Sequence, residues 1–241
     1  MRGPWRRYFV AYYTARPVSH ELARPGPSLF PELEVDRTLN ELDKNGYSVA
    51  FRLSTEQIAE MLSFYEAENS NNIHHPHKKC EVFDKVFRDP NVVAIAREYL
   101  GREPQLYRSR LYFRFPKSSF KSQNSLQARN KKRNVHFDVT DFRDVALFIY
   151  LSDVDEDSSP HVVVEGTHKH KTFWDLLTRR YSREQAEKRF GSQFVELKGP
   201  IGTAFFEDTS VFHIQSQGNA GRLMVAAEYT LQRSPELARY Q

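Results

Sequence analysis

Apolar side chains recur at helical spacing through the first hundred residues of the chain. Residues 34–45 form one such stretch, which ends at Asn45 and Gly46, a typical helix stop. A second stretch begins at a capping-box sequence, Ser54 to Gln57, and ends near Asn69. Two shorter helices are predicted at 78–88 and 91–100. The first part of the chain is therefore predicted to be helical.

From residue 105 the pattern changes to alternation, which is typical of strands. The stretch 105–115 (QLYRSRLYFRF) is the clearest example. Further strands are predicted at 134–139, 144–151, 161–165, 194–198, 202–207, 210–215 and 222–231, with one helix at about 182–190. Helices followed by strands indicate an α+β fold whose strands form a sandwich or jelly roll. No linker is visible, so we expect one domain, 1–241, with a basic and aromatic segment at 1–33, a helical part at 34–101 and a strand-rich part at 105–231.

The composition excludes several classes of protein. Hydrophobic residues make up 39% of the 241 residues and aromatic residues 13%, enough for a sizeable core, so a wholly disordered chain is excluded. No apolar run reaches the roughly 20 residues that a membrane-spanning helix needs. The single cysteine, Cys80, excludes an internal disulfide and a cysteine-rich zinc site. It favours a reducing compartment, and we expect a cytoplasmic protein.

The positive charge gathers in two segments. Residues 1–25 carry five arginines against Glu21 alone, interleaved with Trp and Tyr, and residues 117–133 carry six Lys and Arg without an acid. Arginine beside aromatic side chains suits a membrane interface or an anionic polymer, so we expect peripheral contact with the inner face of a membrane. The alternatives are a loose terminal tail and a solvated loop. Together the two segments indicate an anionic partner.

One constellation carries recognisable chemistry. On a strand, His136 and Asp138 point to the same face and offer a nitrogen and an oxygen to one point. His213, on another predicted strand, is a third candidate ligand, and two His with one carboxylate are typical of non-haem Fe(II) oxygenases. Arg222 follows His213 by nine residues and could hold a carboxylate of 2-oxoglutarate. The alternatives are a hydrogen-bonded His–Asp pair in the core and an ion pair of Arg222 with Asp208.

Three stretches resemble the phytanoyl-CoA dioxygenase-like family of Fe(II)/2-oxoglutarate oxygenases. They are HFDVTDFRDVALFIYLSDVDEDSSPHVVVEGTHK, GPIGTAFFEDTSVFH and GRLMVAAEYTL, and the resemblance covers about residues 105–231. It implies a double-stranded β-helix (cupin-like jelly roll) with N-terminal helices packed on it. It also implies Fe(II) on His136, Asp138 and His213, the distal carboxylate of 2-oxoglutarate on Arg222, and O2 as oxidant. Gln215 stands where the family often has a small polar residue, and is a second candidate for contact with the cosubstrate.

Other polar residues are weaker candidates. Arg108, Arg110 and Arg114 share one face of the strand 105–115, where they either face solvent or line the barrel and meet an anionic substrate. Three further histidines flank Pro76 in a polar stretch, where they either bind metal, lie near the cavity or form a solvated loop: His74, His75 and His77. The resemblance implies that the unit containing His168 is structural, so neither it nor His170 is predicted to be a ligand.

The resemblance implies a dioxygenase that hydroxylates an unactivated C–H bond. We expect an anionic or lipid-linked sugar as substrate, such as Kdo of lipopolysaccharide, because bacterial family members that hydroxylate Kdo would match both basic segments. A small secondary metabolite and an acyl thioester are alternatives. Oxidation of nucleic acid is disfavoured by the sequence around His136. A cupin-like metal enzyme without 2-oxoglutarate and a non-enzymatic binding module for an anionic partner also remain, and the oligomeric state is open.

Overall fold

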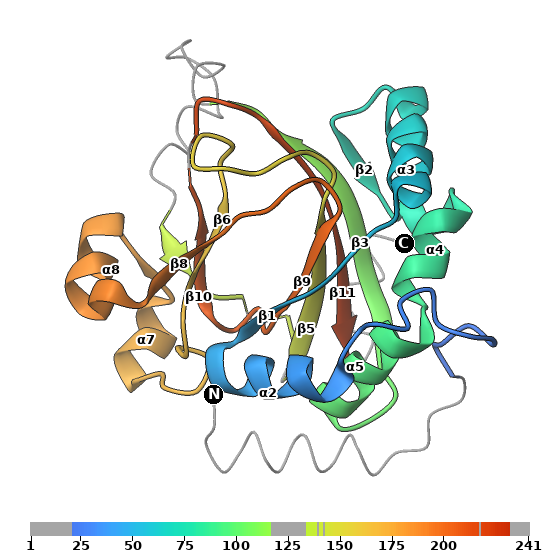
Figure 1. Ribbon diagram of the computed structural model, residues 1–241. Coiled ribbons are helices and arrows are strands. Elements are labelled where there is room, and N and C mark those ends of the chain that lie inside the picture. The colour runs from blue at the N-terminus through green and yellow to red at the C-terminus, as the bar shows by residue number, and fades with distance from the viewer. Residues whose placement is uncertain (1–20, 117–133, 139, 142, 217, 232–241) are drawn as a thin grey trace.

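The computed structural model describes residues 21–116, 134–138, 140–141, 143–216 and 218–231. Its strands form two antiparallel sheets (Figure 1). In spatial order, the larger sheet contains β1 (Tyr47–Arg52), β9 (Thr203–Glu207), β5 (Asp144–Tyr150), β11 (Arg222–Thr230), β3 (Gln105–Arg114) and β2 (Asn72–His74). The smaller sheet contains β7 (Arg180–Tyr181), β4 (Val135–His136), β10 (Phe212–Gln215), β6 (His161–Val164) and β8 (Phe194–Leu197).

The two sheets pack face to face. One apolar cluster joins Tyr150, Phe205 and Met224 of the larger sheet to Val163 and Leu197 of the smaller one. Neighbouring strands in each sheet come from distant parts of the sequence: β5 lies between β9 and β11, and β10 lies between β4 and β6. The fold is a double-stranded β-helix of the jelly-roll type with added helices, which confirms the α+β prediction.

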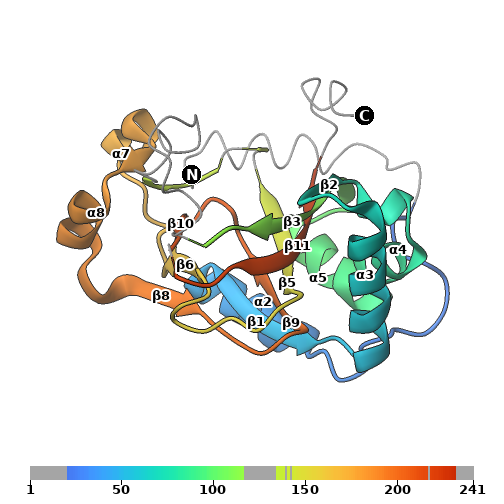
Figure 2. The same cartoon turned by 90° about the horizontal axis from the view of Figure 1, so that it is seen from above.

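Most helices cover the outer face of the larger sheet. They are α2 (Val35–Asn45), α3 (Thr55–Glu68), the 3-10 turn η1 (Pro76–Lys78), α4 (Glu81–Phe87) and α5 (Pro90–Leu100). Their apolar side chains form one core with the outward-facing residues of β3, β5 and β11. Figure 2 shows α7 (Phe173–Thr178) and α8 (Arg183–Phe190) at the opposite end, beside the smaller sheet; the 3-10 turn η3 (Gly191–Gln193) follows α8. In the described part of the chain, no helix combines the length and apolar character needed to cross a membrane.

Local sequence sets the ends of the predicted helices. The N–H of Gly46, at φ 89°, donates to the carbonyl of Leu42 and ends α2 in the left-handed conformation that glycine adopts readily. A side chain at Gly46 would also meet the ring of His168, since an added Cβ would lie 2.8 Å from its Nδ1. Ser54 and Gln57 form the expected capping box at the start of α3. These ends confirm the sequence prediction.

The strand prediction needs a correction in the first part of the chain. All eight predicted strands are present, although β4 contains only Val135–His136. However, β1 and β2 lie within residues 34–101, which were predicted to be helical, and both join the larger sheet. Both are edge strands, and β1 alternates weakly between buried and exposed positions. Because the partner of β1 is β9, far along the chain, tertiary pairing rather than local pattern makes it a strand.

Candidate metal centre and active-site cavity

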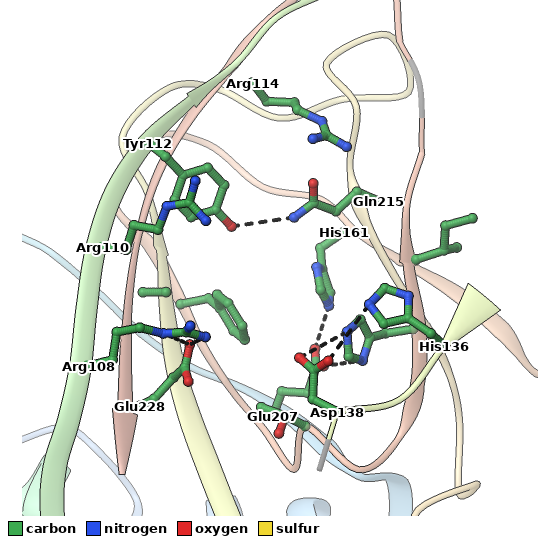
Figure 3. Close-up of a pocket in the computed structure, with 15 residues that line it drawn as sticks. Arg108, Arg110, Tyr112, Arg114, His136, Asp138, His161, Glu207, Gln215 and Glu228 are labelled. Carbon is green, nitrogen blue, oxygen red and sulfur yellow. Dashed lines mark hydrogen bonds and ion pairs between the residues drawn. The ribbon is translucent and has the colours of Figure 1, made fainter. Parts of the chain in front are cut away.

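His136, Asp138 and His213 converge on one point inside the barrel. His136 ends β4 and is the register partner of His213 on β10, and Asp138 follows two residues after His136. One possible ligand atom from each lies within 4.8 Å of the others. Within the described residues this is the one group of three His, Cys, Asp or Glu side chains that could hold a metal ion. Figure 3 shows His136 and Asp138 directed toward the same space.

Backbone carbonyls set the orientation of both imidazole rings. Nδ1 of His136 lies 2.9 Å from the carbonyl oxygen of Asn134, and Nδ1 of His213 lies 3.1 Å from that of Val211. Because a carbonyl oxygen only accepts, each Nδ1 carries the proton and each Nε2 keeps its lone pair. Both Nε2 atoms face Asp138. Metal-binding histidines are commonly held in this way.

The separations within this group fit a single ion. Nε2 of His136 lies 3.9 Å from Oδ1 of Asp138, and Nε2 of His213 lies 3.8 Å from Oδ2. Two ligands that share one ion at typical metal–ligand distances lie at most about 4.2 Å apart. Two imidazoles and one carboxylate suit Fe(II) and leave further coordination positions open. The residues present therefore fit the iron that the sequence pattern implies.

A buried carboxyl group lies behind His213. Oε1 of Glu207 is 3.3 Å from Nδ1 of His213, and Oε2 is 2.6 Å from Nε2 of His161, without the alignment of a hydrogen bond. Burial raises the pKa of Glu207 to about 8 and lowers the pKa of His161 to about 3, so burial favours the neutral form of both groups. Burial also lowers the pKa of His213, which favours the neutral ring that a metal requires.

The cavity in front of these residues has a volume of about 300 Å³. Arg108, Arg110, Tyr112 and Arg114 occupy alternate positions of β3, so all four side chains point to one face, and all line the cavity. Figure 3 shows them across the space from His136 and Asp138. The three arginines therefore line the cavity, as one of the two alternatives has it, and Arg110 is at the same time exposed to solvent.

The three arginines differ in their contacts. Arg108 donates to Glu228 of β11, with Nη2 2.5 Å from Oε1, and this partly buried pair is balanced in charge. Burial alone would lower the pKa of Arg108, but Glu228 outweighs burial and raises it. Nε of Arg110 donates to the neutral side chain of Asn72 at 2.5 Å. Arg110 and Arg114 are thus the cations of this wall for which the described residues show no ion pair.

Arg222 is completely buried at the start of β11, beside the cavity rather than among its lining residues. Its Nη1 donates to the carbonyl of Ser159 at 2.7 Å, and its guanidinium carbon lies 5.5 Å from the ring centre of Tyr150. In the described part of the chain, its Nε and Nη2 have no hydrogen-bond partner, and no ion pair with Asp208 is present. Two buried, unsatisfied guanidinium donors are what a carboxylate of 2-oxoglutarate would satisfy.

Gln215, two residues after His213, lines the cavity, and its contact with the cosubstrate stays a prediction. Its Nε2 donates to the hydroxyl of Tyr112 at 3.4 Å and so joins the two sheets across the interior (Figure 3). The arrangement places a neutral amide between the arginine wall and the metal ligands.

Several residues of the cavity were not singled out from the sequence. They are Tyr112, Phe148, His161, Glu207, Thr209, Ile214, Ala226 and Glu228. Alternation was the available signal for some of them: Glu207 shares the inner face of β9 with Phe205, and His161 is the register partner of Gln215. A glutamate within the otherwise apolar TAFFE strand is the sign that sequence analysis could have used.

His74, His77 and His168 do not belong to the metal-ligand group. Nδ1 of His77 lies 2.6 Å from the hydroxyl of Ser109, and a nitrogen of His74 lies 3.2 Å from the amide of Asn72, with no metal-binding group formed among the described residues. His168 is buried, with Nε2 3.1 Å from the carbonyl of Asp43, which is a structural contact. The basic segment 117–133, and residues 1–20 of the basic N-terminal segment, lie outside the described residues.

Comparison with known proteins decides the family. Residues 27–222 match the family described as Phytanoyl-CoA dioxygenase (PhyH). The chain belongs to the phytanoyl-CoA dioxygenase family. This confirms the resemblance seen in the sequence: the protein is an enzyme that depends on 2-oxoglutarate, with iron as its metal cofactor and O2 as the oxidant. A search of the curated proteins finds no match.

Solved structures of similar shape include three that cover most of this chain. AviO1 from Streptomyces viridochromogenes Tue57 is 13% identical, with a TM-score of 0.59 over 84% of this chain and 96% of that one. EctD from S. alaskensis, solved with bound Fe, is 18% identical, with a TM-score of 0.57 over 90% and 82%. The non-haem α-ketoglutarate-dependent epimerase SnoN from nogalamycin biosynthesis is 16% identical, with a TM-score of 0.61 over 81% and 80%. At these identities the likeness establishes the shared fold.

Membership of the phytanoyl-CoA dioxygenase family sets the reaction class. The protein is an Fe(II)/2-oxoglutarate-dependent oxygenase of this family. The non-enzymatic binding module is thereby excluded as the main role. Arg108, Arg110 and Arg114, which we call the arginine wall, line the same cavity as the metal-ligand candidates.

Proposed function

We propose that this protein hydroxylates an unactivated C–H bond of a small anionic molecule. His136, Asp138 and His213 hold Fe(II), and Arg222 holds the distal carboxylate of 2-oxoglutarate, with Gln215 as a further contact. The observation that carries the proposal is the His–Asp–His group facing three arginines across one cavity. The unsatisfied donors of Arg222 support the placement of the cosubstrate.

The charges of the cavity support an anionic substrate. Arg108 is balanced by Glu228, and the described residues offer Arg110 and Arg114 no acidic partner. A carboxylate or phosphate would form charge-assisted hydrogen bonds with these two side chains. In that position the anion would be anchored on the β3 side, and the rest of the substrate would extend toward His136 and Asp138.

Within this class, a carboxylated sugar such as Kdo of lipopolysaccharide is the specific substrate that we propose to test first. Its carboxylate and hydroxyl groups match guanidinium, Gln215 and Tyr112. A small secondary metabolite and an acyl thioester are the other candidates. Cytoplasmic location and membrane contact through residues 1–25 stay predictions from the sequence, since residues 1–20 lie outside the described part.

The chemistry is divided between the bound groups and the chain. Fe(II) and 2-oxoglutarate supply the oxidising power, so that one oxygen atom of O2 enters the substrate, the other enters succinate, and CO2 is released. The chain binds and orients. Backbone carbonyls keep the protons of His136 and His213 on Nδ1, Arg222 positions the cosubstrate, and the arginine wall fixes which carbon lies nearest the metal.

The first test is anaerobic titration of Fe(II) and 2-oxoglutarate into the metal-free protein. A charge-transfer band at about 500 nm is expected for iron-bound 2-oxoglutarate. It should be absent from His136→Ala, and Arg222→Ala should need at least about tenfold more 2-oxoglutarate to reach it. A folded wild-type protein without any band would contradict the proposed site.

Substrate-dependent succinate release then tests the substrate class. Kdo, other sugar acids and acyl thioesters are compared with a neutral hexose of similar size. We expect a rise in succinate with an anionic compound and none with the neutral sugar, and mass spectrometry should find one added oxygen in the product. A rise only with neutral compounds would contradict the anionic substrate while leaving the iron site intact.

A further inference from the structure

Helix α7 exposes three large apolar side chains. Phe173 and Trp174 are each 69% exposed, and Leu177 is 59% exposed. The positions i, i+1 and i+4 place them on one side of the helix. Six large apolar side chains are exposed in the described part of the chain, and three of them lie on α7, which has only six residues. We call these three side chains the α7 patch.

The helix is turned with its polar side inward. Asp175 is completely buried and accepts hydrogen bonds from Thr172, from the hydroxyl of Tyr181 at 2.7 Å and from Nη2 of Arg189 at 2.7 Å. Leu176 is the residue of α7 that packs against the core below. These anchors fix the orientation of α7, so its apolar side stays exposed although buried apolar groups are normally favoured.

Basic residues flank the α7 patch in the sequence. Residues 168–190 contain seven Lys and Arg against three Asp and Glu. Two of the three acids are engaged with arginines, since Asp175 pairs with Arg189 and Glu187 pairs with Arg183. Arg179 and Arg180, which directly follow the helix, are both exposed. The surroundings of the patch therefore have an excess of positive charge.

The size and composition of the patch favour a lipid surface. Three such side chains at these exposures present roughly 300–450 Å², whereas a stable protein interface needs about 800 Å² from each partner. Trp, Phe and Leu surrounded by Arg and Lys are typical of segments that insert shallowly among anionic headgroups. We infer that the α7 patch docks the protein on an anionic membrane surface.

The patch adjoins the strand that carries a candidate metal ligand. β7 follows α7 directly and pairs with β4, where Arg180 is the register partner of His136. The ammonium of Lys171, just before α7, lies 4.6 Å from the ring centre of Phe137, between His136 and Asp138 in sequence. Docking through α7 would therefore bring β7 and its neighbour β4, which carries His136, close to the lipid headgroups.

Tryptophan fluorescence can test this surface directly. The chain has two tryptophans, Trp5 and Trp174, so Trp5→Phe leaves Trp174 as the single reporter. With vesicles of phosphatidylcholine and phosphatidylglycerol, we expect its emission to shift to shorter wavelength and to be quenched by brominated lipid. Pure phosphatidylcholine and high salt should weaken the effect. An emission unchanged by vesicles, or equal binding to the neutral lipid, would overturn the inference.

Co-sedimentation with the same vesicles compares two matched variants. F173S/W174S/L177S should bind at least about tenfold more weakly than wild type. L29S/V49S also removes exposed apolar groups, 47% and 44% exposed, and should bind like wild type. Equal loss in both variants would contradict a specific patch. An indole of Trp174 already shielded from solvent without vesicles would show that the patch is covered in the free protein, which also overturns the inference.

The inference is independent of the proposed function. F173S/W174S/L177S changes only exposed side chains outside the cavity, so its Fe(II) and 2-oxoglutarate band and its thermal unfolding should match wild type. A band that fails in wild type and variant alike would contradict the iron site and leave the docking surface standing.

Discussion

The two walls of the cavity are built in different ways. On the wall of the smaller sheet, backbone carbonyls orient His136 and His213, so the main chain itself prepares the metal centre. On the wall of the larger sheet, Arg108 and Arg110 are held by other side chains, Glu228 and Asn72. A centre held by the main chain persists as long as the strands do, whereas side-chain partners can be exchanged singly. On the function that we propose, reaction type is fixed on one wall and substrate choice on the other.

Among substitutions in and around the cavity, loss of the Asp138 carboxylate should have the largest effect, and it should act on the affinity for the metal. Asp138→Ala removes the oxygen ligand, and we expect Fe(II) affinity to fall by more than about a hundredfold. Because the side chain of Asp138 is 48% exposed, the thermal unfolding of the metal-free protein should not change. Calorimetric titration with Co(II) under anaerobic conditions measures the loss. Unaltered metal affinity in Asp138→Ala would contradict the assignment of the metal centre to this wall of the cavity.

Removing charge from the opposite wall should affect the substrate alone. In R110Q/R114Q, loss of charge-assisted hydrogen bonds should raise the KM for the anionic substrate by about ten- to a hundredfold. The charge-transfer titration with Fe(II) and 2-oxoglutarate should stay as in wild type. Arg108→Gln is the informative comparison, since it leaves the largely buried Glu228, 15% exposed, without its cation and should lower the unfolding temperature. A change in 2-oxoglutarate affinity in R110Q/R114Q would contradict the proposal that this wall acts on the substrate alone.

A smaller fall in Fe(II) affinity is expected from changes at Glu207, which lies beside His213. Glu207→Leu removes the group 3.3 Å from Nδ1 of His213, and Fe(II) affinity should fall by about tenfold. Glu207→Gln keeps a polar side chain of the same shape and should stay within a few-fold of wild type. Equal losses in the two variants would show that Glu207 fills space and does not position His213.

The smallest expected effect is on the pH dependence of stability, and it comes from His77, which lies behind the arginine wall. Burial, with His75 nearby, lowers the pKa of His77 to about 4, and its ring contacts Ser109 on β3. The unfolded chain takes up this proton near the ordinary pKa, so the stability that neutral His77 contributes is present at higher pH and is lost as the pH falls toward 4. Between about pH 7 and about pH 5, wild type should therefore lose more stability than His77→Gln. Unfolding temperatures that fall in parallel would contradict this.

Sequence analysis predicted the parts of the molecule that local pattern determines. The end of α2 at Gly46, the capping box of α3 and the alternation of β3 are encoded within a few residues, and all are present. The metal candidates were also within reach, because His136 and Asp138 lie two apart on one strand. His213 came from the order of motifs along the chain and is confirmed as their neighbour in space.

The missed parts depend on partners distant in sequence. β1 is a strand because it pairs with β9, and no local signal announces that pairing. Glu207 and His161 meet only when β9 and β6 come together, so neither indicated a site by itself. The orientation of α7 is set by Tyr181 and Arg189, which hold Asp175 inward against the expected amphipathic pattern.

The exposure of Asp138 has an evolutionary consequence. Its side chain is 48% exposed, whereas that of His213 is 9% exposed and that of Glu207 is fully buried. Mutation at position 138 therefore meets little selection from folding, while mutation at 207 or 213 must also satisfy packing. A descendant of this chain could change the ligands of its metal by a single codon at position 138 and keep its shape. Among the metal-ligand candidates and Glu207, position 138 is therefore the one at which a substitution is most readily retained in evolution and can alter the reaction.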